Sequence, residues 1–293
     1  MIVVITGPTA VGKTKLSVEL AKLLDGEVIN ADSTQVYKEM NIGTAKVTEE
    51  EKDGVIHHLF DIKDCVDNYT IYDYQKDCRL KIDDILKRGK IPILVGGTGL
   101  YIKAALYNYE FKDENTKYDF SNLTNEEVYN KLLELDPNTN IHPNNRKRVE
   151  RALTYILNNN DTISNNTKGN ELYYDDVVFI GLTCDRDILY DRINRRVDIM
   201  INDGLIEEAK YFYDKKISSK AIMTPICYKE LFLYFDNIIT LEESIELIKQ
   251  RSRKYAKRQY TFFNHQIPIN WFDVDFDNFN NTITEVYNFV NKI

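Results

Sequence analysis

The sequence is poor in the residues that mark disulfide-rich, zinc-binding and membrane-spanning proteins. Its 293 residues include four cysteines, four histidines and one tryptophan. The cysteines form no C-x-x-C pair, and His57, His58 and His142 have no metal-ligand spacing with them, so we interpret these histidines as polar loop or pocket residues. The apolar runs are far shorter than the ~20 residues that span a membrane, and no basic leader precedes the first run. We therefore expect a cytoplasmic protein with reduced thiols and no membrane contact.

The chain also lacks an overall excess of basic residues. Its 38 lysines and arginines stand against 46 acidic residues, a net charge of −8 that by itself argues against a nucleic-acid partner. The basic residues are nevertheless clustered at 146–151 and at 249–258, and aromatic residues lie within and just after the second cluster. Cationic helices with interleaved aromatic residues suit phosphate contact and base stacking. An ordinary solvated helix is the alternative.

Glycine is scarce, with 12 residues, but two short turns are rich in it. The first turn fits the pattern G-x-x-x-x-G-K-T and lies between an apolar run at Ile2–Ile5 and an amphipathic helical pattern. This context predicts a phosphate-binding P-loop that comprises Gly7, Pro8, Thr9, Ala10, Val11, Gly12, Lys13 and Thr14. Its backbone N–H groups and the Lys13 ammonium would bind an anion, and the Thr14 hydroxyl would bind Mg²⁺.

Apolar runs that alternate with helical patterns indicate the fold class. Glu27–Asn30, Ile91–Val95 and Val177–Leu182 have the length of buried strands, and helical patterns separate them. We predict an α/β fold, namely a doubly wound parallel sheet like that of P-loop NTPases. After the third of these runs we expect mostly helices, ending with the long basic helix and a short strand at Trp271–Val274.

The middle of the chain departs from this alternation. A polar stretch, two helical patterns and an asparagine-rich stretch follow one another there. We therefore expect a small helical insert domain at residues 113–175, within a catalytic core made of residues 1–112 and 176–293.

Three further groups of side chains are candidates for chemistry. Asp32 follows the second strand, at the sheet edge where ligands bind, and is placed to act as a general base or Mg²⁺ partner; a turn cap is the alternative. Thr98 lies in the second glycine turn and would position a substrate group or cap the next helix. Arg192 and Arg196 share one helix face and would clamp an oligophosphate opposite the P-loop.

Taken in order, these motifs resemble the tRNA dimethylallyltransferase family. The resemblance covers essentially the whole chain. It rests on Gly7–Thr14, Asp32–Tyr37, Asn41–Lys46, His57–Leu59, Asp61–Ile62, Gly96–Tyr101, Ile141–Asn144 with Arg148 and Arg151, and Ala256–Gln259. The chain departs from the family pattern at Cys227, where glycine is usual, and at Phe262, where tryptophan is common. The insert also looks shorter than in longer members.

The resemblance implies transfer of a dimethylallyl group from dimethylallyl diphosphate to the exocyclic amine of an adenosine. That adenosine lies 3′-adjacent to the anticodon in tRNAs that read codons beginning with U. The P-loop would hold the diphosphate with Mg²⁺, Asp32 would serve as the base, and Thr98 would assist at the reacting centre. The implied tRNA contacts are Asp32, Ser33, Thr34, Gln35, Lys147, Arg148, Val149, Glu150 and Arg151. We expect the protein to act as a monomer on the anticodon stem-loop.

Three alternatives differ in what they leave unexplained. An adenylate isopentenyltransferase shares the chemistry but has no need of the basic helices. A small-molecule P-loop kinase leaves the motifs around Asp32 and Thr98 without a purpose. A pure RNA-binding module has no use for the P-loop.

Overall fold

The computed structural model describes residues 1–111, 116–162 and 171–292, and the chain divides into two compact units. The first unit comprises Met1–Ala105 and Tyr174–Ile293, and the second comprises Leu106–Tyr173. We placed the insert at 113–175, so the second compact unit begins seven residues earlier and ends two residues earlier than the expected insert.

A six-stranded sheet forms the centre of the first unit, and all its strand pairs are parallel. The strand order is β3-β2-β4-β1-β5-β6. The strands are β1 (Ile2–Thr6), β2 (Gly26–Asn30), β3 (His57–His58), β4 (Ile91–Val95), β5 (Val177–Thr183) and β6 (Asn270–Asp273). The predicted doubly wound parallel α/β fold is therefore confirmed. The chain passes from β1 toward β2 and β3 on one side, and later from β4 across β1 to β5 and β6 on the other side. Ligands bind at such a switch point in the direction of the connections.

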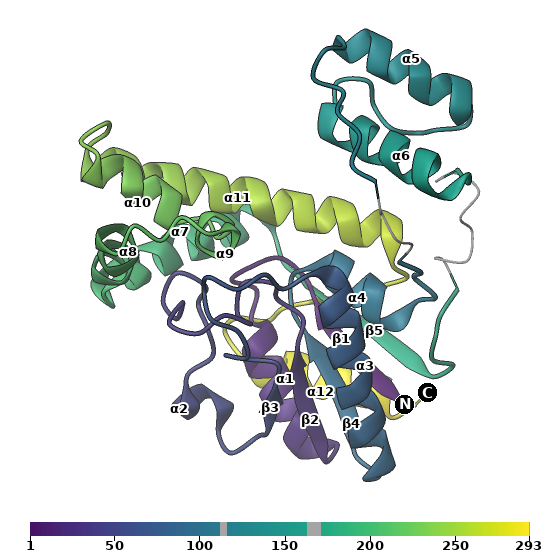
Figure 1. The fold of residues 1–293 in the computed structure, drawn as a ribbon. Helices are drawn as coiled ribbons and strands as arrows, with labels where there is room; N and C mark the ends of the chain where they lie inside the picture. The colour runs from purple at the N-terminus through teal and green to yellow at the C-terminus, as the bar shows by residue number, and fades with distance from the viewer. Residues whose placement is uncertain (112–115, 163–170, 293) are drawn as a thin grey trace. The chain divides into compact units, whose positions relative to one another are not determined.

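Helices α1 (Lys13–Leu23), α3 (Ile71–Lys87) and α12 (Phe279–Val290) pack on this sheet (Figure 1). A second group of helices packs together beside it: α7 (Arg186–Asn202), α8 (Leu205–Asp214), α9 (Lys220–Met223), α10 (Tyr228–Phe235) and α11 (Leu241–Gln266). The remaining helices of this part of the chain are α2 (Glu49–Lys52) and α4 (Gly99–Leu106). Leu16 and Leu20 of α1 join Val286 of α12 and the strand residues Val3 and Ile5 in one core. Burial of these apolar side chains holds the P-loop helix against the sheet.

Two elements escaped the sequence analysis. The pair His57-His58 forms the edge strand β3, which two residues make too short to show any periodicity. The last helix, α12, begins in an asparagine-rich stretch, and its apolar stripe of Ile283, Val286 and Val290 packs on the core. Our expectation that the chain ends at the strand around Trp271 was therefore wrong.

The second unit is a pair of helices with its own small core. Thr124 caps α5 (Asn125–Leu135) through a capping box, and the Asn145 side chain caps α6 (Arg146–Asn159). Val128 and Leu132 of α5 pack against Val149, Ala152, Leu153 and Ile156 of α6. The amphipathic pattern of each helix is thus used to bury one face against the other.

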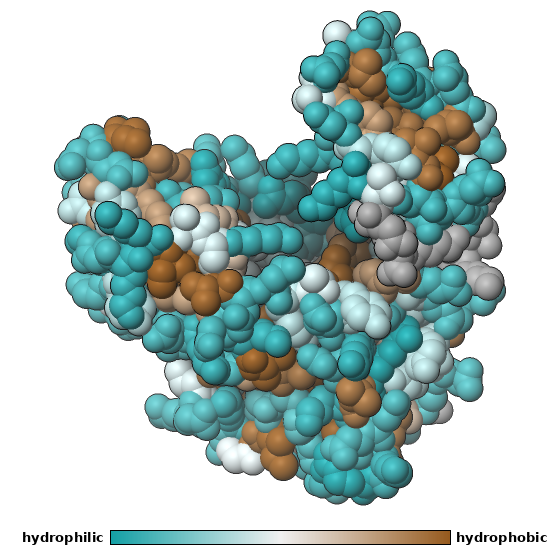
Figure 2. All heavy atoms as spheres, viewed as in Figure 1, coloured by the Kyte–Doolittle hydropathy of each residue, from teal (hydrophilic) through white to brown (hydrophobic). Residues whose placement is uncertain are grey.

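The face of the molecule drawn in Figure 2 shows no large apolar belt. On the face drawn in Figure 2, polar residues predominate and the apolar side chains form small, separate groups. None of the helices in the described residues is both long and apolar enough to cross a bilayer.

Candidate active site

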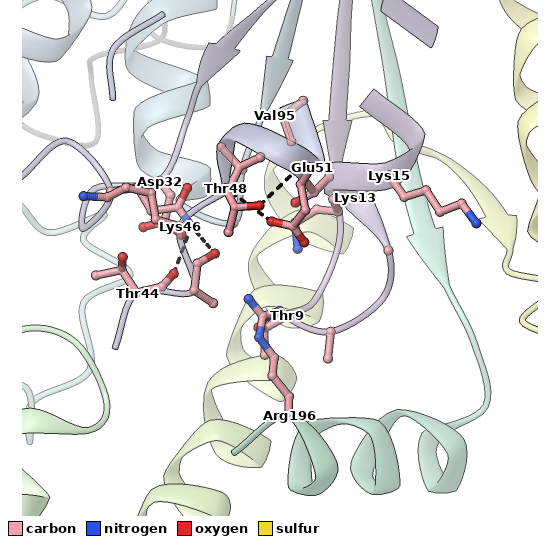
Figure 3. Close-up of a pocket in the computed structure, with 18 of the residues that line it drawn as sticks. Thr9, Lys13, Lys15, Asp32, Thr44, Lys46, Thr48, Glu51, Val95 and Arg196 are labelled. Carbon is pink, nitrogen blue, oxygen red and sulfur yellow. Dashed lines mark hydrogen bonds between the residues drawn. The ribbon is translucent and has the colours of Figure 1, made fainter. Parts of the chain in front are cut away.

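A cavity of about 690 Å³ lies in the first unit where the P-loop meets the carboxyl ends of β2 and β4. It brings together residues that are distant in the sequence, several of which are drawn in Figure 3. Predicted site residues that line it are Thr9, Ala10, Gly12, Lys13, Thr14, Asp32, Gln35, Arg192 and Arg196. The cavity therefore combines an anion-binding loop, a carboxylate and two arginines.

The P-loop is shaped by two glycines in the left-handed region. Gly7 has φ 131° and Gly12 has φ 105°, values that side chains strongly disfavour. A Cβ at Gly7 would also lie 2.5 Å from the carbonyl oxygen of Leu182 in β5. Val11 turns away from the cavity and is fully buried in the core. Glycine at both positions thus lets the loop pass close to the sheet and expose its remaining N–H groups.

Like charges are crowded around this loop. Nζ of Lys13 donates to the carbonyl oxygens of Gly7 (3.1 Å) and Pro8 (2.6 Å). Burial, together with the smaller effect of the Arg196 charge, lowers the pKa of Lys13 to about 7. Nε of Arg192 donates to Ala10 O at 3.0 Å, and burial also lowers the pKa of Arg196. An anion with several charges would relieve this repulsion, because it interacts favourably with each cation.

Asp32 caps a turn with one oxygen of its carboxylate. Its Oδ1 accepts hydrogen bonds from Thr34 N (2.9 Å) and Thr34 Oγ1 (2.7 Å), which is the turn-capping arrangement. Asn30 Oδ1 accepts from Asp32 N at 2.8 Å and fixes the backbone. Among the described residues, Oδ2 of Asp32 has no hydrogen-bond partner. One carboxylate oxygen is therefore anchored, and the other is available at the cavity.

The Thr98 hydroxyl points to the segment that carries Asp32. Its Oγ1 accepts from Ser33 N at 3.1 Å and lies 3.3 Å from Ser33 Oγ. Thr98 thus holds Ser33, the neighbour of Asp32, against the second glycine turn. Tyr255 of α11 lines the cavity; burial, with a smaller effect of the Asp32 charge, raises its pKa, so this phenol stays protonated.

Sequence reasoning missed Glu208, which holds the loop Asn41–Lys46 at the cavity. The Glu208 carboxylate accepts from three successive backbone N–H groups, those of Asn41 (2.9 Å), Ile42 (2.9 Å) and Gly43 (2.8 Å), and from the Tyr228 hydroxyl (2.7 Å). The predicted site residue Gln35 holds the same loop from nearby in the sequence, since its amide donates to the carbonyls of Thr44 (2.9 Å) and Ala45 (3.2 Å). Glu208 is separated from the loop by more than 160 residues, so no local signal reveals it.

The departure at Cys227 has a packing consequence. Cys227 is fully buried, and its thiol donates to Gly43 O at 3.5 Å. A Cβ at Gly43 would lie 2.7 Å from the Cys227 sulfur and 2.6 Å from the Tyr228 ring. The cysteine therefore occupies space beneath the loop, where glycine is usual in the family.

The basic cluster of α11 is only partly turned to solvent. Lys249 pairs with Asp198 (2.7 Å), Arg251 pairs with the buried Glu230, and Arg253 donates to Asn194 (2.5 Å). The exposed cations are Lys254, Lys257 and Arg258. Among the interleaved aromatic residues, Phe263 is fully buried, and Tyr255, Tyr260 and Phe262 are half-buried. The prediction that these rings stack on bases is wrong for Phe263, because it packs in the interior.

The predicted tRNA-binding segment of α6 has one exposed face and one buried face. Lys147, Arg148 and Arg151 are exposed, and Glu150 pairs with Arg146 at 2.5 Å. Val149 as a whole residue is 1 % exposed and belongs to the core of the second unit, and its N–H donates to Asn145 O within the helix, so the prediction that Val149 contacts the tRNA is wrong.

The described residues contain no cluster of three or more histidine, cysteine or acidic side chains that could hold a metal ion. His57 lines the cavity; its Nδ1 lies 2.8 Å from Val55 O, and its buried Nε2 has no partner among the described residues. The ring of His58 instead binds Glu27 at 2.7 Å.

Comparisons with known proteins identify the family. The profile of the IPP transferase family matches residues 35–266. A tRNA dimethylallyltransferase of Anoxybacillus flavithermus is 47% identical over 99% of this chain and 96% of its own length, and that of Bacillus subtilis is 47% identical over 93% and 90%.

Solved structures agree with the sequence comparisons. The full-length tRNA isopentenylpyrophosphate transferase of Bacillus halodurans superposes with a TM-score of 0.78 at 45% identity, covering 99% of this chain and 95% of that one. A eukaryotic dimethylallyltransferase, described as acting on tRNA, gives a TM-score of 0.78 at 32% identity over 92% and 73%. The family profile and these relatives, which match nearly the whole chain, agree with the cationic P-loop and the aspartate at the cavity. The chain belongs to the IPP transferase family of tRNA dimethylallyltransferases.

Proposed function

We propose that this family member transfers a dimethylallyl group from dimethylallyl diphosphate to the exocyclic amine of an adenosine in tRNA. The target is the adenosine 3′-adjacent to the anticodon in tRNAs that read codons beginning with U. The observation that carries the proposal is the cavity that places Lys13 and Arg196 beside the open oxygen of Asp32. The four free cysteines are consistent with action in a reducing cytoplasm.

The cationic half of the cavity suits the leaving group. As the bond between the allylic carbon and oxygen breaks, its electron pair goes to the diphosphate, where negative charge builds up. Lys13, the loop N–H groups, Arg192 and Arg196 would stabilise that charge without rearranging. The Thr14 hydroxyl lines the same cavity and fits Mg²⁺, which usually takes few protein ligands; when bound, the ion would neutralise part of the diphosphate charge.

The carboxylate half suits the nucleophile. The lone pair of an adenine amine is delocalised into the ring, so the amine must lose a proton as its nitrogen bonds to the allylic carbon. Oδ2 of Asp32 is the open acceptor for that proton, and Thr34 holds the other oxygen in place. Asp32 then releases the proton to solvent, and the products are the modified adenosine and diphosphate. Thr98 would keep the Ser33 segment in register with the reacting groups.

For the RNA we propose contacts from both units. Lys147, Arg148 and Arg151 present exposed charges on α6 of the proposed insert domain. The segment Asp32–Gln35 would meet the target nucleotide, which has to leave its stack to enter a deep cavity. One chain carries all these groups, and we propose that it acts as a monomer.

A transfer assay tests this function. The protein is incubated with Mg²⁺ and labelled dimethylallyl diphosphate, together with anticodon stem-loop RNA or AMP. We expect label in the RNA only, and none when guanosine replaces the target adenosine. Label in AMP alone would instead support an adenylate isopentenyltransferase. Phosphate transfer from ATP would support a kinase.

A further inference from the structure

We propose that Gln259 is a positioning residue that fixes the spacing between the two reactants, an inference that rests on the proposed transfer. Its Oε1 accepts from Thr9 N in the P-loop at 3.1 Å, and its Nε2 donates to Gly97 O at 3.1 Å. The side chain is 5 % exposed and lines the cavity. One carboxamide thus spans the diphosphate-binding loop and the turn that carries Thr98.

The packing around the turn shows that this bridge is built into the fold. A Cβ at Gly97 would lie 2.1 Å from Nε2 of Gln259, and one at Gly99 would lie 2.2 Å from the Phe262 ring. On its other side, a Cβ at Gly96 would lie 2.2 Å from the carbonyl of Ala31 at the end of β2. Glycines at these positions therefore let α11 and β2 close on the turn, which leaves it little freedom to move.

No other hydrogen bond among the described residues joins the loop Gly7–Thr14 to Gly97 or Thr98. Arg192 ties the loop to α7, and Lys13 ties it to itself. Ser33 ties Thr98 to the segment of the catalytic Asp32. Just outside these bounds, Thr6 Oγ1 donates to Gly96 O at 3.1 Å, which joins the ends of the two strands that precede the loop and the turn. Gln259 instead bonds the loop and the turn themselves, and so connects the part of the site that holds the leaving group with the part that holds the nucleophile.

Transfer needs the attacking nitrogen, the allylic carbon and the departing oxygen to line up. Misplacement by about 1 Å costs on the order of 100-fold in rate. Because the donor is held by the P-loop and the acceptor by the other segment, loss of the bridge changes their spacing but not the contacts that each makes. The expected signature is a fall in kcat with little change in KM or in RNA affinity.

The test compares two buried glutamines. Gln259→Met keeps the length of the side chain and removes both hydrogen bonds without adding charge. Gln75→Met is the matched control, since Gln75 is also buried (8 % exposed) and its amide donates to a carbonyl, that of Ala104 at 2.8 Å, outside the cavity. We expect the single-turnover rate of Gln259→Met to fall roughly 30-fold or more, with donor KM and stem-loop Kd within about threefold of wild type. Gln75→Met should retain a rate within about threefold of wild type.

A second variant keeps the test decisive if Gln259→Met does not fold. Gln259→Asn retains both amide groups on a chain shorter by one methylene, so it can satisfy only one partner at a time. We expect a rate loss of about tenfold with an unchanged KM. Wild-type rates in the variants that fold, equal losses in Gln75→Met, or an effect confined to KM would overturn the positioning role. Absence of transfer by the wild-type protein would instead contradict the proposed function.

Discussion

Donor binding is expected to require the uptake of a proton by Lys13. Burial and the Arg196 charge hold the pKa of this ammonium at about 7, against a usual value of 10.5. Above pH 7 the free protein therefore carries mostly neutral Lys13, and a bound diphosphate must restore the charge. Because a lysine with a lowered pKa loses its proton as the pH rises, donor affinity should be highest below pH 7 and fall above it. Between pH 7.5 and 9.0 the protonated fraction falls roughly 20-fold, and the Kd should rise by a similar factor.

The assay uses a non-reactive donor analogue whose bridging oxygen is replaced by sulfur. A phosphate group with a second pKa near ~6 is fully ionised in this pH range, so its own titration does not interfere. Calorimetry at pH 8 in two buffers of different ionisation enthalpy should show uptake of about 0.9 proton. Lys13→Arg is the control, since a guanidinium stays charged and should show neither proton uptake nor a pH slope. A pH-independent Kd in the wild-type protein, or the same slope in Lys13→Arg, would refute this role of the lysine.

Three further substitutions test separate parts of the molecule. Asp32→Asn should lower transfer by at least about 10³-fold and leave the stem-loop Kd nearly unchanged, as judged by single-turnover and binding measurements; a large loss of RNA affinity would contradict a purely catalytic role. Arg148→Ala should weaken RNA binding and reduce the slope of log K against log salt by about 1, and an unchanged slope would remove Arg148 from the phosphate contacts. Glu27→Gln should lower the free energy of unfolding at pH 7 by about 2 kcal/mol in urea denaturation, because the buried carboxylate bonds Arg88 and His58. Arg88 lowers the pKa of Glu27 from 4.5 to about 2, so this contribution is complete above pH 4.5 and lost as the pH falls through 2. A difference between wild type and Glu27→Gln that persists below pH 2 would argue against the ion pair as its source.

The parts of the site that follow from local sequence were the easiest to predict. Gly7–Thr14 folds as a P-loop because a strand, two glycines and a helix are all specified within a short stretch. Asp32 reaches the cavity because it directly follows a strand of a parallel sheet. Both features depend on residues that are close together in the sequence, so they can be predicted without a structure.

The contacts that align these parts could not be predicted from local patterns. Gln259 meets Thr9 and Gly97, and Glu208 meets the loop at Asn41, across separations of more than 160 residues. Hydrogen bonds of this kind depend on how α8 and α11 pack within the folded chain, and this packing leaves no spacing signal in the sequence. The glycines of the second turn also illustrate this limit. Gly97 and Gly99 have no positive φ, so their backbone conformation does not require glycine. Glycine is needed there because the side chains of Gln259 and Phe262 lie too close to leave room for a Cβ atom.

The same limit applies to charge. A lysine or arginine on a helix can face an RNA, pair with a carboxylate, or hold a loop. The sequence of the basic cluster on α11 does not distinguish among these three roles. Arg251 pairs with Glu230, whereas Lys257 and Arg258 remain exposed with no ion pair described for them. An internal pair such as Arg251 with Glu230 contributes no net charge, so the excess of −8 lies in acidic residues elsewhere in the chain, and salt screens those that are more than about 10 Å from a bound phosphate. An acidic chain can therefore present a basic surface to RNA, because the partner responds to the charge that is left unpaired near it.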